Sequence, residues 1–544
     1  MSFEYDFIIV GSGFGGSVSA LRLAEKGYSV CVVERGKRFE DSDFPKTNWN
    51  LRKYLWLPFF RCFGIQNISL FRNIFILSGS GVGGGSLVYA NTLLEPTDAF
   101  YHAPVWKNLA HWKEELAPHY LTAKKMLGVA PNPHFTTADR ILRECAKDIG
   151  REATFQMAEV GVYFGEPGKA APDPYFEGEG PPRKGCIFCG GCMVGCRFNA
   201  KNTLLKNYLY FAEKLGVRIL PERNVDNIIP IEGGYAVHTS SSTSWFKKYP
   251  LVFKSKNVIF SAGVLGTVHL LLKCKYLTKT LPLLSGQLGK EVRTNSEAIV
   301  GVTVPDLDKD CDFSKGIAIT SRFHPNGYTA IEPVRYPSGS SFMRLLTAPM
   351  IEGQSFFVKL AQIVGVFMSS PIKMLRLAFI KDWAKSTVIL LVMQTLDNKI
   401  QLKLGRNLFT LFQKKIVTYS KGAKKFPTIM PIAHEICRLF AQKTHGIAQS
   451  AIHEVLLDIP STAHILGGCV IGSDSLSGVI DSNHQILGYQ GLFVCDGSVI
   501  PANLGVNPSL TITALSERAM SKIPPKNASS QKTLSESDYT AGSQ

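Results

Sequence analysis

Three glycines near the start of the chain have the spacing that binds a dinucleotide. Gly11, Gly13 and Gly16 fit the pattern G-x-G-x-x-G, directly between an apolar strand and a helix. The first glycine permits a tight turn, the second lets the backbone approach a pyrophosphate, and the third lets the helix pack on the strand. Glu34 closes the following strand, where its carboxylate would bind ribose hydroxyls and repel the extra phosphate of NADP. FAD and NAD share this fingerprint, so it predicts a dinucleotide site without choosing between them.

A second glycine-rich segment, residues 78–91, holds five glycines among fourteen residues. So many missing side chains suggest backbone packed closely against a flat partner, and an isoalloxazine ring would suit such a loop. A flexible linker is the alternative. The apolar run Leu87-Val-Tyr argues against a linker, so the segment points to a flavin.

Two residues near the C-terminus could handle the proton of an alcohol. His464 stands just before Gly467 and Gly468, and an imidazole with a pKa of about 6.5 accepts or orients a proton near neutral pH. Asn507 offers an amide that can fix the position of a hydroxyl group. Pro508 then begins a Thr- and Leu-rich helix, whose free N–H groups favour an anionic edge such as N1–C2=O of a flavin. A structural core histidine is the alternative for His464, but the glycines and Asn507 favour catalysis.

Four cysteines, Cys186, Cys189, Cys192 and Cys196, have the spacing of a bacterial ferredoxin run. Arg197 replaces the proline that usually follows, and no second run exists to share the fourth cysteine, so one iron–sulfur cluster would need an unusual closure. Zinc and a reduced turn without metal are the alternatives. A cluster would carry electrons away from a flavin and would favour a dehydrogenase over an oxidase that consumes O2.

The elements that must position these groups begin with a β-α-β unit. Residues 5–10 form a continuous apolar strand, residues 17–26 a helix and residues 29–34 a second strand. Short strands return in residues 217–230 and 257–262, whereas residues 300–455 show no regular pattern. Glycine-rich, ordered sequence resumes after Pro460. Signals of one nucleotide domain at both ends of the chain therefore predict that a substrate domain interrupts it.

Together these motifs resemble the glucose–methanol–choline oxidoreductases. Gly-Val-Gly-Gly-Gly-Ser-Leu-Val at residues 81–88 and His-x-x-Gly-Gly-Cys-Val-x-Gly at residues 464–472 are similar to the bacterial cholesterol oxidases with non-covalent FAD, and most of all to their mycobacterial branch. The resemblance covers residues 4–522. It implies an α/β fold with a discontinuous Rossmann-like FAD-binding domain and an α+β substrate domain with a large antiparallel sheet.

The segments follow from the motifs and the resemblance. FAD-binding segments are expected at residues 1–44, 200–297 and 460–523, a cap region with the second glycine loop and the cysteines at 45–199, a substrate domain at 298–459 and a disordered tail at 524–544.

The resemblance also implies the roles of individual residues. His464 and Asn507 would face the flavin and the substrate hydroxyl, and Glu332 would move a proton between steroid carbons, with a salt bridge to Arg335 as the alternative role of this carboxylate. The implied FAD contacts are Gly11, Gly13, Gly16 and Glu34 for the ADP part, Gly83, Gly84, Gly85, Ser86 and Asn91 near the ring, Val225 near adenine, Asp496 and Gly497 at the ribityl or phosphate side, and Asn507 and Pro508 at the far edge of the ring.

The implied reaction is oxidation of a 3-hydroxysteroid to the 3-ketosteroid, with O2 reduced to H2O2 and Δ5 to Δ4 isomerisation as a second step. One alternative is a dehydrogenase of another hydrophobic alcohol with a quinone or cytochrome acceptor. The other is a non-catalytic lipid-binding flavoprotein, against which the intact pair His464 and Asn507 argues.

The charge and the apolar stretches bear on partners. The net charge is +17, but no Lys- and Arg-rich block interleaved with aromatics resembles a nucleic-acid groove. Residues 51–76 and 356–379 combine bulky apolar side chains with Lys and Arg, which suits an anionic membrane from which a sterol could pass to the site. Core packing with snorkelling cations is the alternative. The N-terminus shows no secretory signal, so we expect a cytoplasmic chain, peripheral to the membrane at most.

Overall fold

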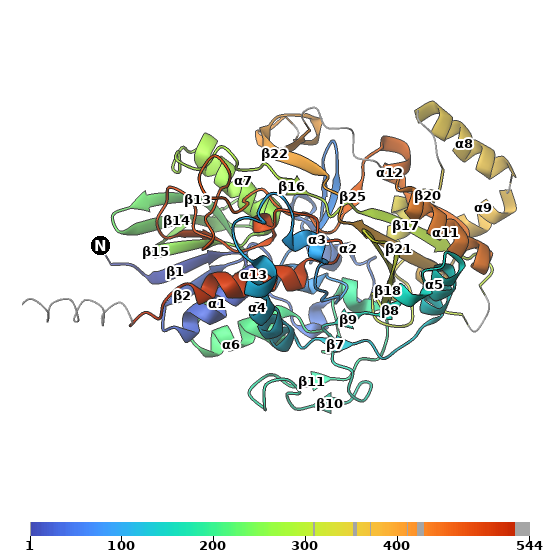
Figure 1. The fold of residues 1–544 in the computed structure, drawn as a ribbon, viewed down its shortest axis with the longest axis horizontal. Helices are drawn as coiled ribbons and strands as arrows, with labels where there is room; N and C mark the ends of the chain where they lie inside the picture. Colours follow the sequence, from blue (N-terminus) through green and yellow to red (C-terminus); the bar gives the residue numbers. More distant parts are fainter. Residues whose placement is uncertain are drawn as a thin grey trace, which may run out of the picture.

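The computed structural model describes residues 2–307, 311–351, 356–369, 371–410, 412–420 and 429–527. Two large sheets lie toward opposite ends of the molecule, one with parallel strands and one that is antiparallel, and helices pack around both (Figure 1). The predicted α/β class with a large antiparallel sheet is therefore confirmed. The expected tail at residues 528–544 lies outside the described residues.

The nucleotide-type sheet has the strand order β12-β2-β1-β15-β14-β13, with β26 pairing β15. β1 and β2 are short apolar runs buried on both faces, as in a parallel sheet covered by helices, whereas β13 and β14 pair antiparallel at one edge. The strands are β1 (Tyr5–Val10), β2 (Val30–Val33), β12 (Arg218–Leu220), β13 (Arg223–Ile231), β14 (Gly234–Ser241), β15 (Leu251–Phe260) and β26 (Leu492–Val494). The first and the last of these come from opposite ends of the sequence and lie on either side of β15.

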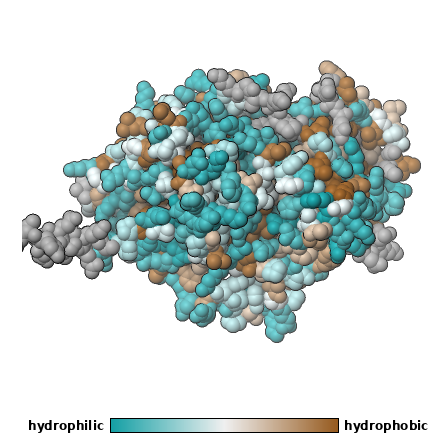
Figure 2. Space-filling view, in the orientation of Figure 1, coloured by the Kyte–Doolittle hydropathy of each residue, from teal (hydrophilic) through white to brown (hydrophobic). Residues whose placement is uncertain are grey.

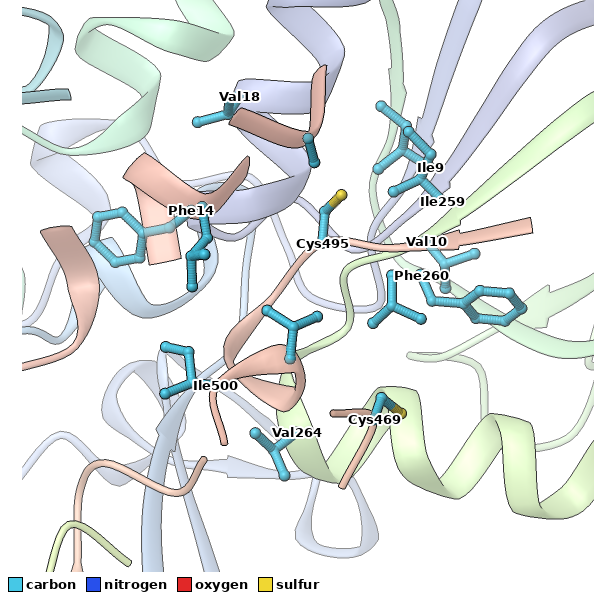
Figure 3. Close-up of a cluster of buried hydrophobic side chains, with 14 of the residues drawn as sticks. Ile9, Val10, Phe14, Val18, Ile259, Phe260, Val264, Cys469, Cys495 and Ile500 are labelled. Carbon is cyan, nitrogen blue, oxygen red and sulfur yellow. The ribbon is translucent and has the colours of Figure 1, made fainter. Parts of the chain in front are cut away.

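Helices join the two ends of the chain over this sheet. α1 (Phe14–Glu25) packs against α13 (Ser509–Ser521), which also contacts α4 (Trp112–Leu127). Arg22 of α1 donates to Glu517 of α13 at 2.7 Å, and the hydroxyl of Tyr208 donates to the same carboxylate at 2.6 Å. Figure 3 shows the core beneath, where Ile9, Ile259 and Cys495 meet between the strands and α1.

The second sheet has the order β20-β24-β17-β21-β19-β18-β8 and is antiparallel throughout. One face packs against α5 (Thr137–Asp148) and α11 (Pro431–Thr444), and on the other face side chains such as Ile299 and Leu391 point toward the candidate site. The strands are β8 (Gln156–Met157), β17 (Ala298–Thr303), β18 (Ser321–Asn326), β19 (Thr329–Val334), β20 (Thr347–Pro349), β21 (Thr387–Gln394) and β24 (Ile447–Ala451).

Smaller elements connect the two sheets. β5 (Gln66–Leu70) and β6 (Phe75–Gly79) form a hairpin that β25 (Ser461–Thr462) extends, and the turn η3 (Gly84–Leu87) follows. A three-stranded sheet joins β16 (Val292–Arg293), β22 (Lys399–Gly405) and β23 (Lys415–Tyr419). The other helices are α2 (Leu51–Tyr54), α3 (Asp98–Tyr101), α6 (Tyr208–Lys214), α7 (Gly263–Tyr276), α8 (Phe356–Ser369), α9 (Pro371–Ala378), α10 (Trp383–Ser386) and α12 (Ile452–Leu457).

The residues just after the last helix are held against the nucleotide-type sheet. Tyr28 donates its hydroxyl to the carbonyl of Pro524 at 2.9 Å, and the ammonium of Lys526 pairs with Asp6 at 2.6 Å. Residues 524–527 at the start of the expected tail are therefore anchored. The domain boundaries as such stay a prediction.

Candidate active site

The first glycine loop leaves open space in front of α1. A Cβ at Gly11 would lie 2.3 Å from the carbonyl oxygen of Ser261, and one at Gly16 would lie 2.1 Å from that of Gly11. A Cβ at Gly13 would meet no atom within 4 Å. Gly11 and Gly16 thus serve packing, whereas Gly13 borders a space in which a pyrophosphate can approach the helix N-terminus.

Glu34 and Ser12 tie this loop to its surroundings. One carboxylate oxygen of Glu34 accepts from the backbone N–H of Ser12 at 3.1 Å and from its hydroxyl at 2.8 Å, and the other accepts from the N–H of Gly36 at 2.8 Å. The Ser12 hydroxyl also accepts from the N–H of Gly83 at 3.1 Å, which links the two glycine loops. Ser12 had no role in the sequence interpretation, because a serine inside the fingerprint carries no signal of its own.

The second glycine loop presses against the first. A Cβ at Gly84 would lie 2.7 Å from the Cα of Gly13. The Ser86 hydroxyl donates to the carbonyl of Gly83 at 2.7 Å and accepts from the N–H of Leu204 at 3.1 Å. Gly85 also belongs to the η3 turn that these contacts fix.

Asn91 carries the clearest sign of a missing partner. It is fully buried in a left-handed conformation (φ 73°), and neither its amide oxygen nor its amide nitrogen has a hydrogen-bond partner in the described part of the chain. An unsatisfied buried polar group costs about 1–3 kcal/mol. A bound ring with polar edge atoms would satisfy the amide, so this loop fits the implied FAD.

Three further implied FAD contacts lie in the nucleotide-type half. Asp496 is buried, and its carboxylate accepts from Thr267 at 2.5 Å and from the N–H of Ser498 at 2.8 Å, which positions the turn that begins at Gly497. Val225 lies near the start of β13 and packs partly against the core. The contacts of these three residues with FAD stay predictions.

His464 is held by a carboxylate that the sequence interpretation missed. Nδ1 of His464 donates to Glu297, whose other oxygen accepts from the N–H of Ala463 at 2.7 Å. The Glu297 side chain is fully buried. Burial lowers the pKa of His464, but the charge and hydrogen bond of Glu297 together with the Glu332 charge outweigh this effect, so the net shift is upward. Because Nδ1 is engaged, Nε2 is the nitrogen left for a ligand.

Glu332 and Asn507 meet beside this pair. Nδ2 of Asn507 donates to Glu332 at 3.3 Å, while the Asn507 carbonyl oxygen and the second Glu332 oxygen have no partner among the described residues. Burial raises the pKa of Glu332 to about 7, even though Arg322, His464 and Asn507 act in the opposite direction. Three implied catalytic residues from distant parts of the sequence therefore lie in one buried polar cluster.

The alternative salt bridge between Glu332 and Arg335 is wrong. Side chains alternate along a strand, so residues three apart point to opposite faces. Arg335 instead donates to the carbonyl of Lys315 at 2.6 Å and to the Thr136 and Thr320 hydroxyls at 3.1 and 3.0 Å.

Asn295 holds Asn507 in place. Its amide oxygen accepts from the N–H groups of Leu504 and Gly505, both at 3.0 Å, and its amide nitrogen donates to the carbonyl of Val506 at 3.0 Å. This clamp fixes the turn before Asn507. Pro508 then leads into α13, as predicted from the sequence.

An apolar cavity lies against strands β17 and β21 of the antiparallel sheet. It has a volume of about 60 Å3, and Phe75, Ile299, Met343, Trp383 and Ile389 are among its lining residues. Ile299 lies two positions from Glu297. The polar lining residue His453 binds the Ser461 hydroxyl at 2.7 Å, and burial lowers the pKa of this histidine to about 4, so it is uncharged at neutral pH. The cavity therefore suits an apolar molecule.

The cysteine segment does not form the metal site that its spacing suggested. Within the part of the chain that the structure describes, no three His, Cys, Asp or Glu side chains are placed to hold a metal ion. Cys186 and Cys192 pack in an apolar cluster, and burial raises the pKa of the Cys189 thiol to about 11. The ammonium of Lys201 donates to the carbonyl of Cys192 at 2.8 Å. Among the described residues the iron–sulfur and zinc interpretations, which included Cys196, are thus not supported.

Known proteins are similar to this chain in sequence and in fold. A GMC oxidoreductase family pattern matches residues 413–516, and an NAD(P)-binding Rossmann-like pattern matches residues 9–39. A cholesterol oxidase of Acinetobacter baumannii is 45% identical over 99% of this chain and 97% of its own. A cholesterol oxidase of Mycobacterium tuberculosis (strain ATCC 25618 / H37Rv) is 46% identical over 96% of this chain and 92% of its own.

Solved structures agree on the fold. A formate oxidase of Aspergillus oryzae superposes with a TM-score of 0.64 at 14% identity and covers 97% of this chain and 99% of its own. A fungal aryl-alcohol oxidase gives a TM-score of 0.58 at 16% identity and covers 96% and 99% of the two chains. With relatives of this identity over nearly its whole length, the chain belongs to the GMC oxidoreductase family.

Proposed function

We propose that this protein is an FAD-dependent oxidoreductase that oxidises the 3-hydroxyl group of a cholesterol-like sterol to a ketone, with O2 as the electron acceptor. The observation that carries the proposal is the polar cluster of His464, Glu297, Asn507 and Glu332, which lies on the antiparallel sheet whose strands β17 and β21 also line an apolar cavity. The names of the relatives 45–46% identical to this chain support the substrate class.

The two glycine loops would hold FAD. Gly13 and the start of α1 would receive the pyrophosphate, Glu34 the ribose, and the loop from Gly83 to Asn91 the ring. When bound, FAD supplies the acceptor for the hydride that leaves the carbinol carbon.

The chain's own residues would place the alcohol and take its proton. Asn507 offers its unpartnered carbonyl oxygen and an N–H donor to the substrate hydroxyl, which fixes the C–H bond that breaks. Nε2 of His464 accepts the hydroxyl proton as the carbonyl forms. Glu297 holds the tautomer with Nδ1 protonated and stabilises the imidazolium that results. Glu297, Glu332 and Asn507 are buried and the His464 side chain is only 14% exposed, so little bulk water reaches these groups.

Glu332 would then serve the isomerisation. As a carboxylate it removes a proton from the carbon between the new ketone and the Δ5 double bond, and it returns that proton two carbons further on to give the Δ4 product. We expect Glu332→Gln to lose at least 100-fold in the isomerisation rate, because an amide cannot take up a proton, and to keep sterol oxidation within about tenfold of wild type. Separate assays of the Δ5 and Δ4 ketones would measure the two steps.

The isomerisation should also depend on pH. Because the active form of Glu332 is the ionised one and its pKa is raised to about 7, the wild-type rate should rise as pH increases through about 7. The role of Glu332 would be excluded if Glu332→Gln isomerised at the wild-type rate, or if the wild-type rate were flat across this range.

Gly13→Ala should separate FAD binding from folding. Gly13 has φ −70°, which alanine adopts readily, and its Cβ would enter open space. We expect an unchanged Tm of the FAD-free protein but an FAD affinity at least about tenfold weaker, since the methyl group occupies the path of the pyrophosphate. Gly150→Ala is the control. A Cβ at Gly150 would also enter open space, although at a strained φ of 68°, and Gly150 belongs to neither glycine loop. Equal FAD affinity in wild type and Gly13→Ala would contradict the assignment.

A substrate and acceptor screen tests the reaction as a whole. Purified protein with added FAD would be given cholesterol or a long-chain primary alcohol in air, with peroxide and ketone measured, and again with an artificial electron acceptor. Peroxide formed with cholesterol in air is the expected result. Turnover only with the artificial acceptor would indicate that the physiological acceptor is a quinone or cytochrome and not O2. Turnover only with the long-chain alcohol would indicate that the substrate is not a sterol.

A further inference from the structure

The half of the molecule that carries the antiparallel sheet has apolar side chains both on its surface and in its interior. Hydrophobic residues gather on the visible face at this end (Figure 2), although no described helix is long and apolar enough to cross a membrane. The apolar cavity against β17 and β21 lies in the same half. Because a polar group inside such a cavity costs free energy unless it is hydrogen-bonded, the polar side chains of its lining are informative.

His453 is a polar lining side chain with unused hydrogen-bonding capacity. It lies in α12, is 8% exposed, and its ring stacks on that of Phe75 with the centroids 4.3 Å apart. Nε2 of His453 lies 2.7 Å from the Ser461 hydroxyl, which donates to Glu454 at 2.6 Å. Since that hydroxyl gives its proton to Glu454, its oxygen accepts the proton of Nε2. Burial lowers the pKa of the imidazole to about 4, so Nδ1 carries a lone pair at neutral pH, and it has no partner among the described residues.

Gln449 of β24 supplies the complementary group. It is 4% exposed and lines the same cavity. Its amide oxygen accepts from the Thr303 hydroxyl at 2.6 Å, whereas its amide nitrogen has no partner in the part of the chain that the structure describes. The cavity is thus bordered by a lone pair on His453 and an N–H donor on Gln449. A hydroxyl group satisfies both, because it donates one hydrogen bond and accepts another.

The cavity lies on the same sheet face as a residue assigned to the reaction. Glu332 of β19 is the register partner of Leu391 in β21, and Leu391 is the partner of Ile299 in β17. Residues directly opposite one another on neighbouring strands point to the same face. Ile299 lines the cavity, and two strand spacings place it about 10 Å from Glu332. A sterol that lies along this face with its reacting end at Glu332 therefore extends its far rings toward the cavity.

We propose that His453 and Gln449 select a sterol with a second hydroxyl group on ring C or D, which they bind while the 3-hydroxyl group lies at His464 and Asn507. Plain cholesterol would leave both lining groups without a partner, and a polar site built for a hydroxyl group discriminates against a substrate that lacks it. The inference rests on the proposed function for the placement of the 3-hydroxyl group. Binding of the second hydroxyl group requires no turnover, so it is measured separately.

Binding of non-reacting ketones to the FAD-loaded protein tests the site. The ligands are the Δ4 3-ketones of cholesterol and of its 7-, 12- and 16-hydroxy derivatives, and quenching of the fluorescence of Trp383 reports binding at the cavity wall. We expect the 12- or the 16-hydroxyl group to lower the dissociation constant at least about tenfold. The 7-hydroxyl group on ring B, which stays short of the cavity, should give no gain. The kcat/KM values of the corresponding 3-hydroxysterols should follow the same order.

Substitutions at the two lining residues separate the two hydrogen bonds. His453→Gln keeps a donor near the position of Nε2 and loses the acceptor at Nδ1, so the gain from the second hydroxyl group should shrink to less than about threefold. His453→Asn places an amide oxygen near the position of Nδ1 and should retain part of the gain. Gln449→Glu still accepts from Thr303 but lacks the N–H donor, and it should lose the gain as well. His324→Gln, at a half-buried histidine of the same sheet, is the matched control and should leave the gain unchanged.

The outcomes separate this site from the proposed function. Equal affinity for all of the ketones, or a wild-type gain in both His453→Gln and Gln449→Glu with unchanged Tm, would overturn the inference. Oxidation of cholesterol at the same kcat/KM as the 12- and 16-hydroxysterols would also overturn it, while the function would stand. A hydroxyl gain in binding without oxidation of any sterol would uphold the site and refute the function.

Discussion

Replacement of His464 by alanine should lower kcat for sterol oxidation by about 100- to 10,000-fold, the range expected when a general base is lost. Glu297 holds one ring nitrogen of His464, and the Glu332 carboxylate, which binds Asn507, lies near enough to interact with the imidazole electrostatically. The other proton acceptor in the cluster, Glu332, is assigned to the later isomerisation, so the variant would lack a base for the hydroxyl proton. FAD content should stay near one per chain, since His464 lies outside both glycine loops.

Asn507→Ala is the companion variant for this experiment. It removes the amide that would fix the hydroxyl but leaves the base, so it should raise KM and lower kcat less than His464→Ala does. Absorption spectra and Tm of both variants show whether FAD and fold are retained. A His464→Ala protein that keeps FAD and turns over sterol within about threefold of wild type would remove His464 from the mechanism.

Glu297→Gln should give the second large effect, a kcat lower by about 10- to 100-fold together with a shifted pH profile. Glutamine can still accept the Nδ1 hydrogen bond, so the substitution removes the charge and keeps the shape. Burial lowers the pKa of His464, and this effect is outweighed by the Glu297 hydrogen bond, the Glu332 charge and, most of all, the Glu297 charge. Without it burial dominates, the histidine becomes a weaker base, and the acid limb of the kcat profile should move to lower pH.

The pH profile distinguishes this role from a merely structural one. Glu115→Gln serves as the control, because Glu115 also pairs with a basic residue, Arg518 at 2.9 Å, but far from the cluster. That variant should leave the acid limb in place. An unmoved acid limb in Glu297→Gln, with a normal Tm, would show that the carboxylate does not act on His464.

The β-α-β unit and the C-terminal helix could be predicted from local sequence, because their signals are local. The apolar run at residues 5–10 and the glycine spacing after it define β1 and the start of α1, and Pro508 defines the start of α13. The antiparallel sheet could not be derived this way and was expected only from the resemblance. β21 reads Thr-Val-Ile-Leu-Leu-Val-Met-Gln and packs on both faces, so it lacks the alternation that marks a half-exposed strand.

The candidate site shows the same limit. His464, Asn507 and Glu332 could be named from residue type and resemblance, but their partners depend on long-range pairing. Glu297 reaches His464 because β17 follows it into the centre of the sheet, 167 residues before the histidine. The cysteine spacing is a local pattern as well, and among the described residues it does not bring three ligating side chains into position for a metal ion.

Anaerobic mixing of the FAD-loaded protein with cholesterol tests the central claim most directly. The visible flavin absorption near 450 nm is lost when the ring accepts a hydride. We predict that this band bleaches fully in the wild type, with one ketosteroid formed per flavin, and that bleaching slows by the same factor as kcat in His464→Ala. A folded protein that takes up no FAD, or whose bound flavin keeps its absorption in the presence of sterol, would contradict the claim.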